Sequence, residues 1–196
     1  MKRLFLDTSN KYLYICVLDN NEVIFSHIQE GNNNHSETLM DKVKELFDKY
    51  HLNIQKIDEI YVGKGPGSYT GVRVACTISK VLAYALNIKL FSFSSLDLLL
   101  TTKIGKGTFK VVMDARRGFS YAKVVKVDEK VNIVLDEVYI ETTKLNEKYP
   151  DCTLVNIDDI YTDKLNYDVL KLLEFNLVEE VKDVHAFVPT YLRSGV

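Results

Sequence analysis

The stretch of this sequence with the most chemical information is rich in glycine: Gly63-Lys64-Gly65-Pro66-Gly67-Ser68-Tyr69-Thr70-Gly71-Val72-Arg73. It lies between a short apolar run and a longer apolar one, which predicts the end of a strand and the start of a helix capped by Ser68 or Thr70. Free N–H groups at a helix start attract phosphates and carboxylates. Glycine also permits positive φ angles and close backbone approach, so a tight structural turn is the other interpretation.

Two well-known phosphate-binding patterns do not match this segment. The Lys-Ser/Thr ending of a Walker A loop is missing, and the glycine spacing, interrupted by Pro66, departs from the dinucleotide-binding fingerprint. Gly65, Gly67 and Ser68 are therefore candidates for nucleotide contact that no motif identifies further.

Aspartates at the ends of two predicted strands are the next candidates. Asp7 ends a strand over Arg3–Asp7, and Asp114 ends one over Phe109–Asp114. Each carboxylate either contacts a nucleotide's metal ion or caps a turn. Arg116 follows Asp114 closely and either pairs with a phosphate through its planar guanidinium or projects into solvent.

The histidines and cysteines argue against a catalytic metal site. The four histidines, His27, His35, His51 and His185, include no pair with the His-x-x-x-His or His-Glu-x-x-His spacing. The three cysteines, Cys16, Cys76 and Cys152, are far apart within apolar stretches, which is typical of packed, reduced thiols in the cytoplasm. We therefore expect a cytoplasmic protein without a metal of its own.

Composition excludes further classes of function. The 196 residues include 25 Lys and Arg and 27 Asp and Glu, giving a net charge of −2. This balance argues against a polybasic protein that binds nucleic acid or membrane surfaces alone. No apolar run reaches the ~20 residues that a membrane-spanning helix needs.

Periodicity predicts an α/β lobe in the first half of the chain. The expected elements are strands at Arg3–Asp7, Tyr12–Leu18 and Val23–Ile28, a helix with Leu39, Val43, Leu46, Phe47 and Tyr50 on one face, a strand at Ile57–Val62, a helix over about Thr70–Leu86, a strand at Lys89–Phe93 and a short helix from Ser95. The first three strands form a meander, and the helix crossovers after it indicate a mixed sheet.

A second, shorter lobe is predicted after a segment rich in Lys, Thr and Gly at residues 101–107. Strands are expected at Phe109–Asp114, Ser120–Val127 and Val131–Tyr139. From Glu141 on, short helices, of which Asp168–Phe175 has the clearest pattern, and fragments of strand are expected. The predicted domains are residues 1–103 and 104–196.

The segment Gly65–Arg73 resembles the signature of the TsaB (YeaZ) family. Four further stretches agree with that family: Leu6-Asp7-Thr8-Ser9, His35-Ser36-Glu37, Met113-Asp114-Ala115-Arg116-Arg117 and Pro189-Thr190-Tyr191-Leu192-Arg193. The resemblance runs the length of the chain and is weakest from Tyr139 to Val184. It implies a two-lobed α/β fold of the actin-like ATPase, ribonuclease H-like type, with a shortened second lobe.

The resemblance also implies a role. Members of this family are regarded as non-catalytic partners of their paralogue TsaD, with TsaE as a third component. The complex adds a threonylcarbamoyl group to N6 of the adenosine 3′ to the anticodon in tRNAs that read ANN codons. By this resemblance the chain has no cofactor of its own, meets ATP or ADP only at a complex interface and meets tRNA only through the complex.

A partner surface is expected on the two helices of the first lobe. The second helix is apolar over more than one stripe, so one stripe packs on the sheet and the excess either meets a partner or lies in a thicker core. The resemblance implies that these helices bind TsaD and, through the same surface, a second copy of the chain. The expected contact positions are Met40, Val43, Phe47 and Tyr84.

One alternative function comes from a different class. A stand-alone actin-like ATPase or phosphotransferase would use Asp7, Asp114 and the glycine-rich turn. Magnesium-dependent nucleotide binding by the isolated chain would favour this alternative. Proteolysis, which the older name glycoprotease for members of this family suggests, is disfavoured because the histidine spacing of a metalloprotease is missing.

Overall fold

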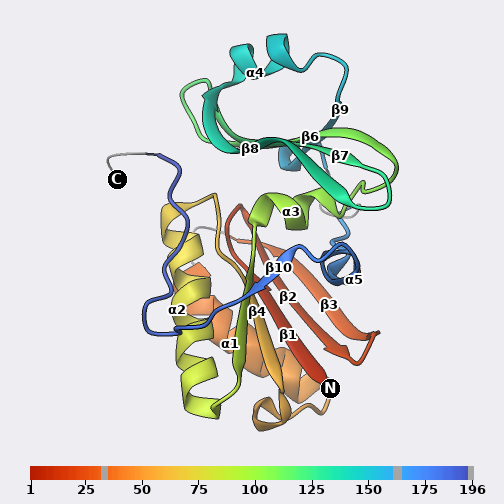
Figure 1. Cartoon of the computed structure of the whole chain (residues 1–196). Coiled ribbons are helices and arrows are strands. Elements are labelled where there is room, and N and C mark those ends of the chain that lie inside the picture. The colour runs from red at the N-terminus through yellow and green to blue at the C-terminus, as the bar shows by residue number, and fades with distance from the viewer. Residues whose placement is uncertain (32–34, 161–164, 194–196) are drawn as a thin grey trace. The chain divides into compact units, whose positions relative to one another are not determined.

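The computed structural model describes residues 1–31, 35–160 and 165–193, which form two compact units with one sheet each (Figure 1). The first unit comprises Met1–Ser94 and Val178–Pro189, and the second comprises Ser95–Leu177 and the chain from Thr190 on. These units divide the chain differently from the predicted domains 1–103 and 104–196, which stay a prediction. The difference arises because helix α3 (Ser95–Leu100) packs on a strand of the second sheet, whereas a late segment returns to the first sheet.

The first sheet has six strands in the order β10-β5-β4-β1-β2-β3. Their bounds are β1 Lys2–Asp7, β2 Tyr12–Asp19, β3 Glu22–Glu30, β4 Glu59–Gly63, β5 Lys89–Phe93 and β10 Val178–Glu180. Strands β1, β2 and β3 form the predicted antiparallel meander, β4 and β5 run parallel to β1, and β10 is antiparallel to β5. Asn20 takes a left-handed φ of 54° in the β2–β3 turn, as an Asn at a hairpin turn permits.

Helices α1 (His35–Lys49) and α2 (Tyr69–Leu86) cover one face of this sheet (Figure 1). Leu4, Leu6, Ile15 and Ile60 from the strands form an apolar core with side chains of both helices. Helix α2 begins at the predicted cap, where Ser68 Oγ accepts from the Gly71 N–H at 3.3 Å, and is followed by the left-handed Asn87. Its buried face repeats every three or four residues: Val72, Ala75, Cys76, Ser79 and Ala83.

Ser79 has the one buried side-chain polar atom without a hydrogen-bond partner among the described residues. Its hydroxyl is fully buried on the core face of α2, and a buried hydroxyl without a partner is unfavourable. We expect Ser79→Ala to stabilise the protein by about 1 kcal/mol, since alanine also has the higher helix propensity. Urea unfolding monitored by circular dichroism measures the change. The control is Thr77→Ala, which removes a hydroxyl from the opposite, exposed side of α2. A lower free energy of unfolding for S79A than for the wild type would contradict the expectation.

The second sheet has four strands in the order β8-β7-β6-β9. Their bounds are β6 Gly107–Asp114, β7 Phe119–Val127, β8 Val131–Glu141 and β9 Thr153–Asn156; helices α4 (Thr142–Lys148) and α5 (Val169–Glu174) belong to the same unit. The predicted meander β6-β7-β8 is confirmed, and Asp168 caps α5 by accepting from the Leu170 N–H. The register of β8 against β7 shifts between Ala122 and Val124 and again between Val124 and Val125.

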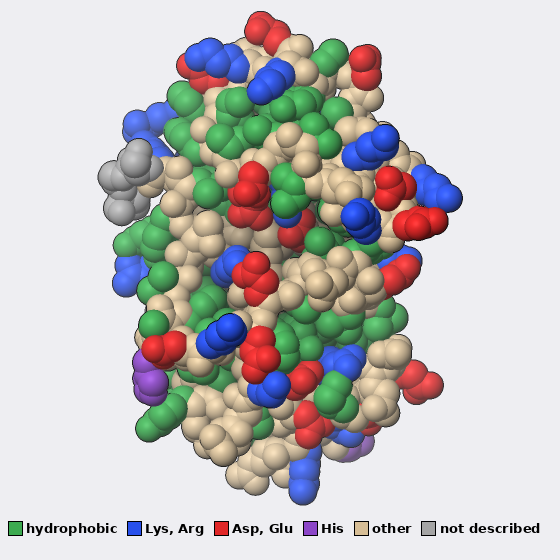
Figure 2. Space-filling model, in the orientation of Figure 1, with side chains coloured by type: hydrophobic (Ala, Val, Ile, Leu, Met, Phe, Trp, Pro, Cys, Tyr) green, Lys and Arg blue, Asp and Glu red, His purple; other side chains and the backbone are tan. Residues whose placement is uncertain are grey.

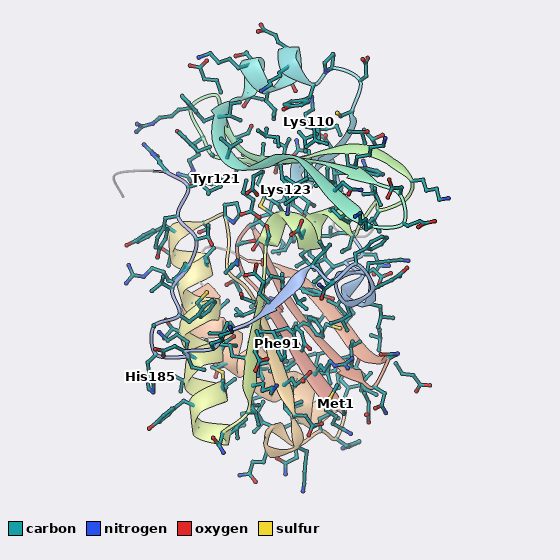
Figure 3. All side chains as sticks on the ribbon, in the orientation of Figure 1. Met1, Phe91, Lys110, Tyr121, Lys123 and His185 are labelled. Carbon is teal, nitrogen blue, oxygen red and sulfur yellow. The ribbon has the colours of Figure 1, made fainter. Side chains whose placement is uncertain are left out.

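Two lysines of the second unit are buried on opposite faces of its sheet (Figure 3). Lys123 donates to both carboxylate oxygens of Asp97 on α3, at 2.7 and 2.9 Å. Lys110 donates to Asn146 Oδ1 at 2.7 Å and to the Tyr149 carbonyl at 3.2 Å, at the end of α4. Each buried cation thus ties a helix to the sheet.

Candidate functional site

The glycine-rich turn of the first unit is in direct backbone contact with the turn that follows β1. The Ser68 N–H donates to the Ser9 carbonyl at 2.6 Å, and Thr8 Oγ1 donates to the Gly71 carbonyl at 2.6 Å. A Cβ atom on Gly67 would lie 2.1 Å from the Ser9 carbonyl oxygen, and one on Gly71 would lie 1.9 Å from that of Thr8. The glycines are needed for this close approach. We call the contact of residues 65–71 with Thr8 and Ser9 the glycine clamp.

Asp7 belongs to the same cluster. Its side chain is 1% exposed, and Oδ1 accepts from the Ser9 N–H at 2.8 Å and from Ser9 Oγ at 2.7 Å. The carboxylate therefore helps to hold the turn against which Gly67 packs. The structure brings together Asp7, Gly67 and Ser68, three of the residues predicted to contact a nucleotide.

A phosphate group does not fit the glycine clamp as it stands. The Ser68 N–H already donates to a carbonyl, and the space in front of Gly67 is filled by the backbone of Ser9. Phosphate contact at this turn would require the two backbones to separate. The glycine pattern allows either an anion site or a tight structural turn, and the observed geometry matches the close backbone approach of a tight turn. Nucleotide contact by Asp7, Gly65, Gly67 and Ser68 stays a prediction.

The other two predicted nucleotide contacts, Asp114 and Arg116, lie in the β6–β7 turn of the second unit. Asp114 Oδ1 accepts from the Arg116 N–H at 2.9 Å, so this carboxylate shapes the turn. Arg116, Arg117 and Gly118 have successive positive φ angles of 66°, 57° and 78°. Both arginine side chains are exposed at the tip of the hairpin.

Cys76 lies beneath the glycine clamp and is not poised as a nucleophile. Its thiol is buried on α2, 3.8 Å from the Gly63 carbonyl. Burial, with a smaller effect of the nearby Asp7 charge, raises the pKa of this thiol from 9.0 to about 12. The group is therefore protonated near neutral pH. No group of three or more potential metal ligands occurs in the part of the chain that the structure describes.

The raised pKa of Cys76 predicts a loss of stability in alkali. Because the thiol ionises near pH 9 when unfolded and near pH 12 when folded, its contribution is complete below about pH 9 and disappears as pH rises towards 12. Between these values the free energy of unfolding should fall more steeply for the wild type than for Cys76→Ala. Urea titrations at several pH values test this, with the partly exposed Cys152→Ala as control. Equal slopes for wild type and C76A would contradict it.

The exposed side of α2 is the most apolar helical surface of the first unit. Val81 and Tyr84 are 61% and 69% exposed, and no Asp or Glu occurs in the helix. A groove of about 410 Å³ follows its first half, lined by Tyr69, Thr70, Arg73, Val74, Thr77 and Ile78. By contrast, Figure 2 shows charges of both signs interspersed over the face that it displays.

After β10, the chain around His185 and Phe187 runs beside α2. Lys80 Nζ donates to the carbonyls of His185 and Phe187, both at 2.9 Å, and the rings of Tyr84 and His185 meet edge to face at 5.0 Å (Figure 3). This segment fixes one border of the exposed surface of α2. Nothing in the sequence pattern indicated this contact, because it joins residues about a hundred positions apart.

The four predicted partner contacts separate into two exposed and two buried side chains. Tyr84 and Met40 are 69% and 40% exposed. Val43 and Phe47 are 2% and 4% exposed and pack in the core against the sheet. A direct partner contact is therefore available to Met40 and Tyr84 in this structure, whereas Val43 and Phe47 support the helix from beneath.

Comparison with known proteins identifies the relatives of the chain. The family model described as TsaD, tRNA N6-adenosine threonylcarbamoyltransferase, matches residues 23–187. The tRNA threonylcarbamoyladenosine biosynthesis protein TsaB of Bacillus subtilis is 31% identical over 98% of this chain and 94% of its own length. TsaB of Haemophilus influenzae is 28% identical over 69% of this chain and 58% of its own length.

Two solved structures of YeaZ or YeaZ-like proteins are also similar to this chain. YeaZ from Pseudomonas aeruginosa superposes with a TM-score of 0.65 at 26% identity, covering 71% of this chain and 67% of its own. A protein described as similar to peptidase YeaZ from the same organism superposes with a TM-score of 0.76 at 22% identity, covering 98% of this chain and 99% of its own. At this low identity the superposition is evidence for the fold and not for a function. The predicted two-lobed actin-like α/β fold with a smaller second lobe is confirmed. The 31% identity to TsaB of Bacillus subtilis over 98% of the chain shows that this chain belongs to the TsaB (YeaZ) family.

Proposed function

We propose that this chain acts in the biosynthesis of threonylcarbamoyladenosine in tRNA as a non-catalytic subunit that supports the catalytic paralogue TsaD. The observation that carries this proposal is the 31% identity to the Bacillus subtilis protein of that pathway over 98% of the chain. The product would be the modified adenosine 3′ to the anticodon in tRNAs reading ANN codons. TsaE would be the third component of the assembly.

The non-catalytic part of the proposal is supported by what the candidate site residues do. Asp7 and Ser68 are engaged with the backbone turn at Ser9, and the Cys76 thiol is held protonated. Asp7, Ser68 and Cys76 thus each have a structural use in the first unit. A stand-alone ATPase would need the glycine clamp to open, so we place ATP or ADP only at an interface with the partner.

The exposed surface of α2 is the proposed contact with TsaD, and with a second copy of the chain when TsaD is absent. Val81 and Tyr84 provide apolar area, and the groove next to Arg73 provides a recess for a partner side chain. Helices pair through such stripes by fitting side chains into grooves. A symmetric pair of copies would bring the same helix of each copy together.

Tyr84→Asp should abolish this association and leave the subunit folded. The side chain is 69% exposed, so a carboxylate is solvated in the free subunit but desolvated in the complex. Co-purification with TsaD and light scattering of the isolated chain measure the two associations. Val134→Asp, a similar change at a half-exposed position of the second unit, is the control. Unchanged association of the Y84D protein would refute the assignment of this surface.

Mass spectrometry of tRNA nucleosides tests the function itself. Cells depleted of this protein should lose threonylcarbamoyladenosine and regain it with the wild-type chain but not with Tyr84→Asp. Undiminished modification during verified depletion would overturn the proposed function. Magnesium-dependent ATP hydrolysis by the isolated chain would then favour the stand-alone ATPase.

A further inference from the structure

Three aromatic rings gather at one end of the second sheet. Phe119 and Tyr121 on β7 and Tyr139 on β8 project to the same face, since Tyr121 lies opposite Tyr139 and Phe119 is two residues away. The rings of Phe119 and Tyr139 stack at 4.7 Å with an interplanar angle of 4°, and that of Tyr121 lies 5.8 Å from Tyr139. All three side chains are only partly buried.

The rest of this face is used differently. Lys123 projects to the same side as Tyr121 and is covered by α3 through its ion pair with Asp97 (Figure 3). The rings lie farther along the strand, beyond the residues that α3 covers. On this face of the second sheet, the buried ion pair thus lies at the middle of β7 and the partly buried rings lie near the start of that strand.

Three exposed arginines border the rings. Arg116 and Arg117 occupy the turn that leads into Phe119, and the Arg193 guanidinium lies over the Tyr139 ring at 5.8 Å from its centroid. No described residue forms an ion pair with these arginines. The neighbouring carboxylates are engaged: Asp114 accepts from the Arg116 N–H, and Glu141 pairs with Lys144 at 2.8 Å. With three arginines and Lys144 against Asp114 and Glu141, the border of the rings carries a net positive charge, in a chain whose net charge is −2.

This combination fits a particular ligand chemistry. Unpaired bases stack on aromatic rings and on guanidinium planes, and arginine binds phosphate through its planar fork of donors. A small nucleotide favours an enclosed, concave pocket, whereas these rings lie on the flat face of a sheet. Aromatic residues on adjacent strands of a sheet are a recurrent means of holding single-stranded RNA.

We propose that Phe119, Tyr121 and Tyr139, with Arg116, Arg117 and Arg193, bind an unpaired segment of tRNA, the bases on the rings and the phosphates on the arginines. We call these six residues the ring surface. The choice of tRNA rests on the proposed function, whereas the chemistry of a stacked base beside a phosphate rests on the geometry. The chain then contributes its own contact to the RNA that the complex modifies.

Fluorescence anisotropy of the full chain with a labelled anticodon stem-loop RNA tests the proposal. Tyr121→Leu removes the ring that is tilted against Tyr139 rather than stacked on it, keeps an apolar side chain, and should weaken binding about tenfold. Arg116→Asn with Arg117→Asn removes two charges while keeping residues that tolerate left-handed angles, and should lower the slope of log affinity against log salt by about 2. Lys126→Asn with Lys130→Asn removes two exposed charges elsewhere in the unit and should leave the slope nearly unchanged.

Several results would overturn the proposal: no binding by the wild type, equal binding by the ring-surface variants, equal binding of a fully paired duplex, or displacement of the RNA by stoichiometric ATP. The last result would indicate a mononucleotide site. Circular dichroism of each variant shows whether a loss reflects misfolding, and Arg193→Gln, at a position outside helices and strands, provides a variant that leaves the sheet intact. If the wild-type chain restores threonylcarbamoyladenosine in depleted cells but does not bind the RNA, only the inference about the ring surface is wrong. If it does not restore the modification, the proposed function is wrong.

Discussion

Lys123→Met should destabilise the protein by about 3–5 kcal/mol, the range typical of removing one partner of a buried ion pair. Lys123 and Asp97 are each 7% exposed, and the ammonium group lies 2.7 Å from the nearer carboxylate oxygen. Glu137 lies 4.0 Å from the same ammonium group. Methionine keeps most of the side-chain volume, so the loss reports on the charge rather than on a cavity. The variant leaves two carboxylates close together with no cation between them.

Urea unfolding of three variants separates this effect from others. Lys126→Met changes an exposed lysine on the same strand and should alter the free energy of unfolding by at most about 0.5 kcal/mol. Lys123→Met combined with Asp97→Leu should recover part of the loss, because an apolar pair can replace a buried ion pair, whereas Glu137 still loses its contact with the ammonium group. A loss below about 1 kcal/mol for K123M alone would show that the pair is not buried in solution.

Local pattern was enough to predict most elements of this fold. The aromatic and β-branched residues of Tyr12–Leu18 and the turn at Asn20 specified the first meander, and the glycines before Ser68 located the start of α2. The pattern did not reveal β10, which has three residues and exists only because it pairs with β5, more than eighty positions away. Short helices and fragments of strand were predicted after Glu141, but the bounds of α4 and β9 were not, since segments of seven and four residues carry too little periodicity.

The candidate site was harder to predict because its meaning depends on contacts between distant segments. A lysine within the predicted strand Ser120–Val127 looks like a solvent-facing residue, and only the position of Asp97 on α3 shows that Lys123 is buried. Periodicity placed Val43 and Phe47 on one stripe of α1 without indicating that this stripe faces the sheet. The glycines allowed both an anion site and a close approach, and the partner backbone at Ser9 was invisible to any local signal.

Gly71→Ala tests the glycine clamp and should destabilise the protein by at least about 3 kcal/mol, the upper end of typical overpacking losses. The new Cβ would lie 1.9 Å from the Thr8 carbonyl oxygen. Neither side can move easily, because Gly71 belongs to α2 and Thr8 follows directly after β1. Helix α2 would have to move away from β1, which also breaks the bond from Thr8 Oγ1 to the Gly71 carbonyl. Since α2 carries the proposed partner surface, binding of TsaD should weaken together with stability.

A glycine elsewhere in the chain provides the matched control. Gly105 has no atom within 4 Å of an added Cβ, so Gly105→Ala should be neutral or slightly stabilising in the same urea titration. Thr8→Val removes only the hydroxyl contact and should cost about 1 kcal/mol, which separates the hydrogen bond from the backbone collision. If Gly71→Ala proved as stable as Gly105→Ala, the two backbones would have to lie farther apart than observed. The space in front of Gly67 would then be open to a phosphate, and nucleotide binding at this turn would again compete with a purely structural role.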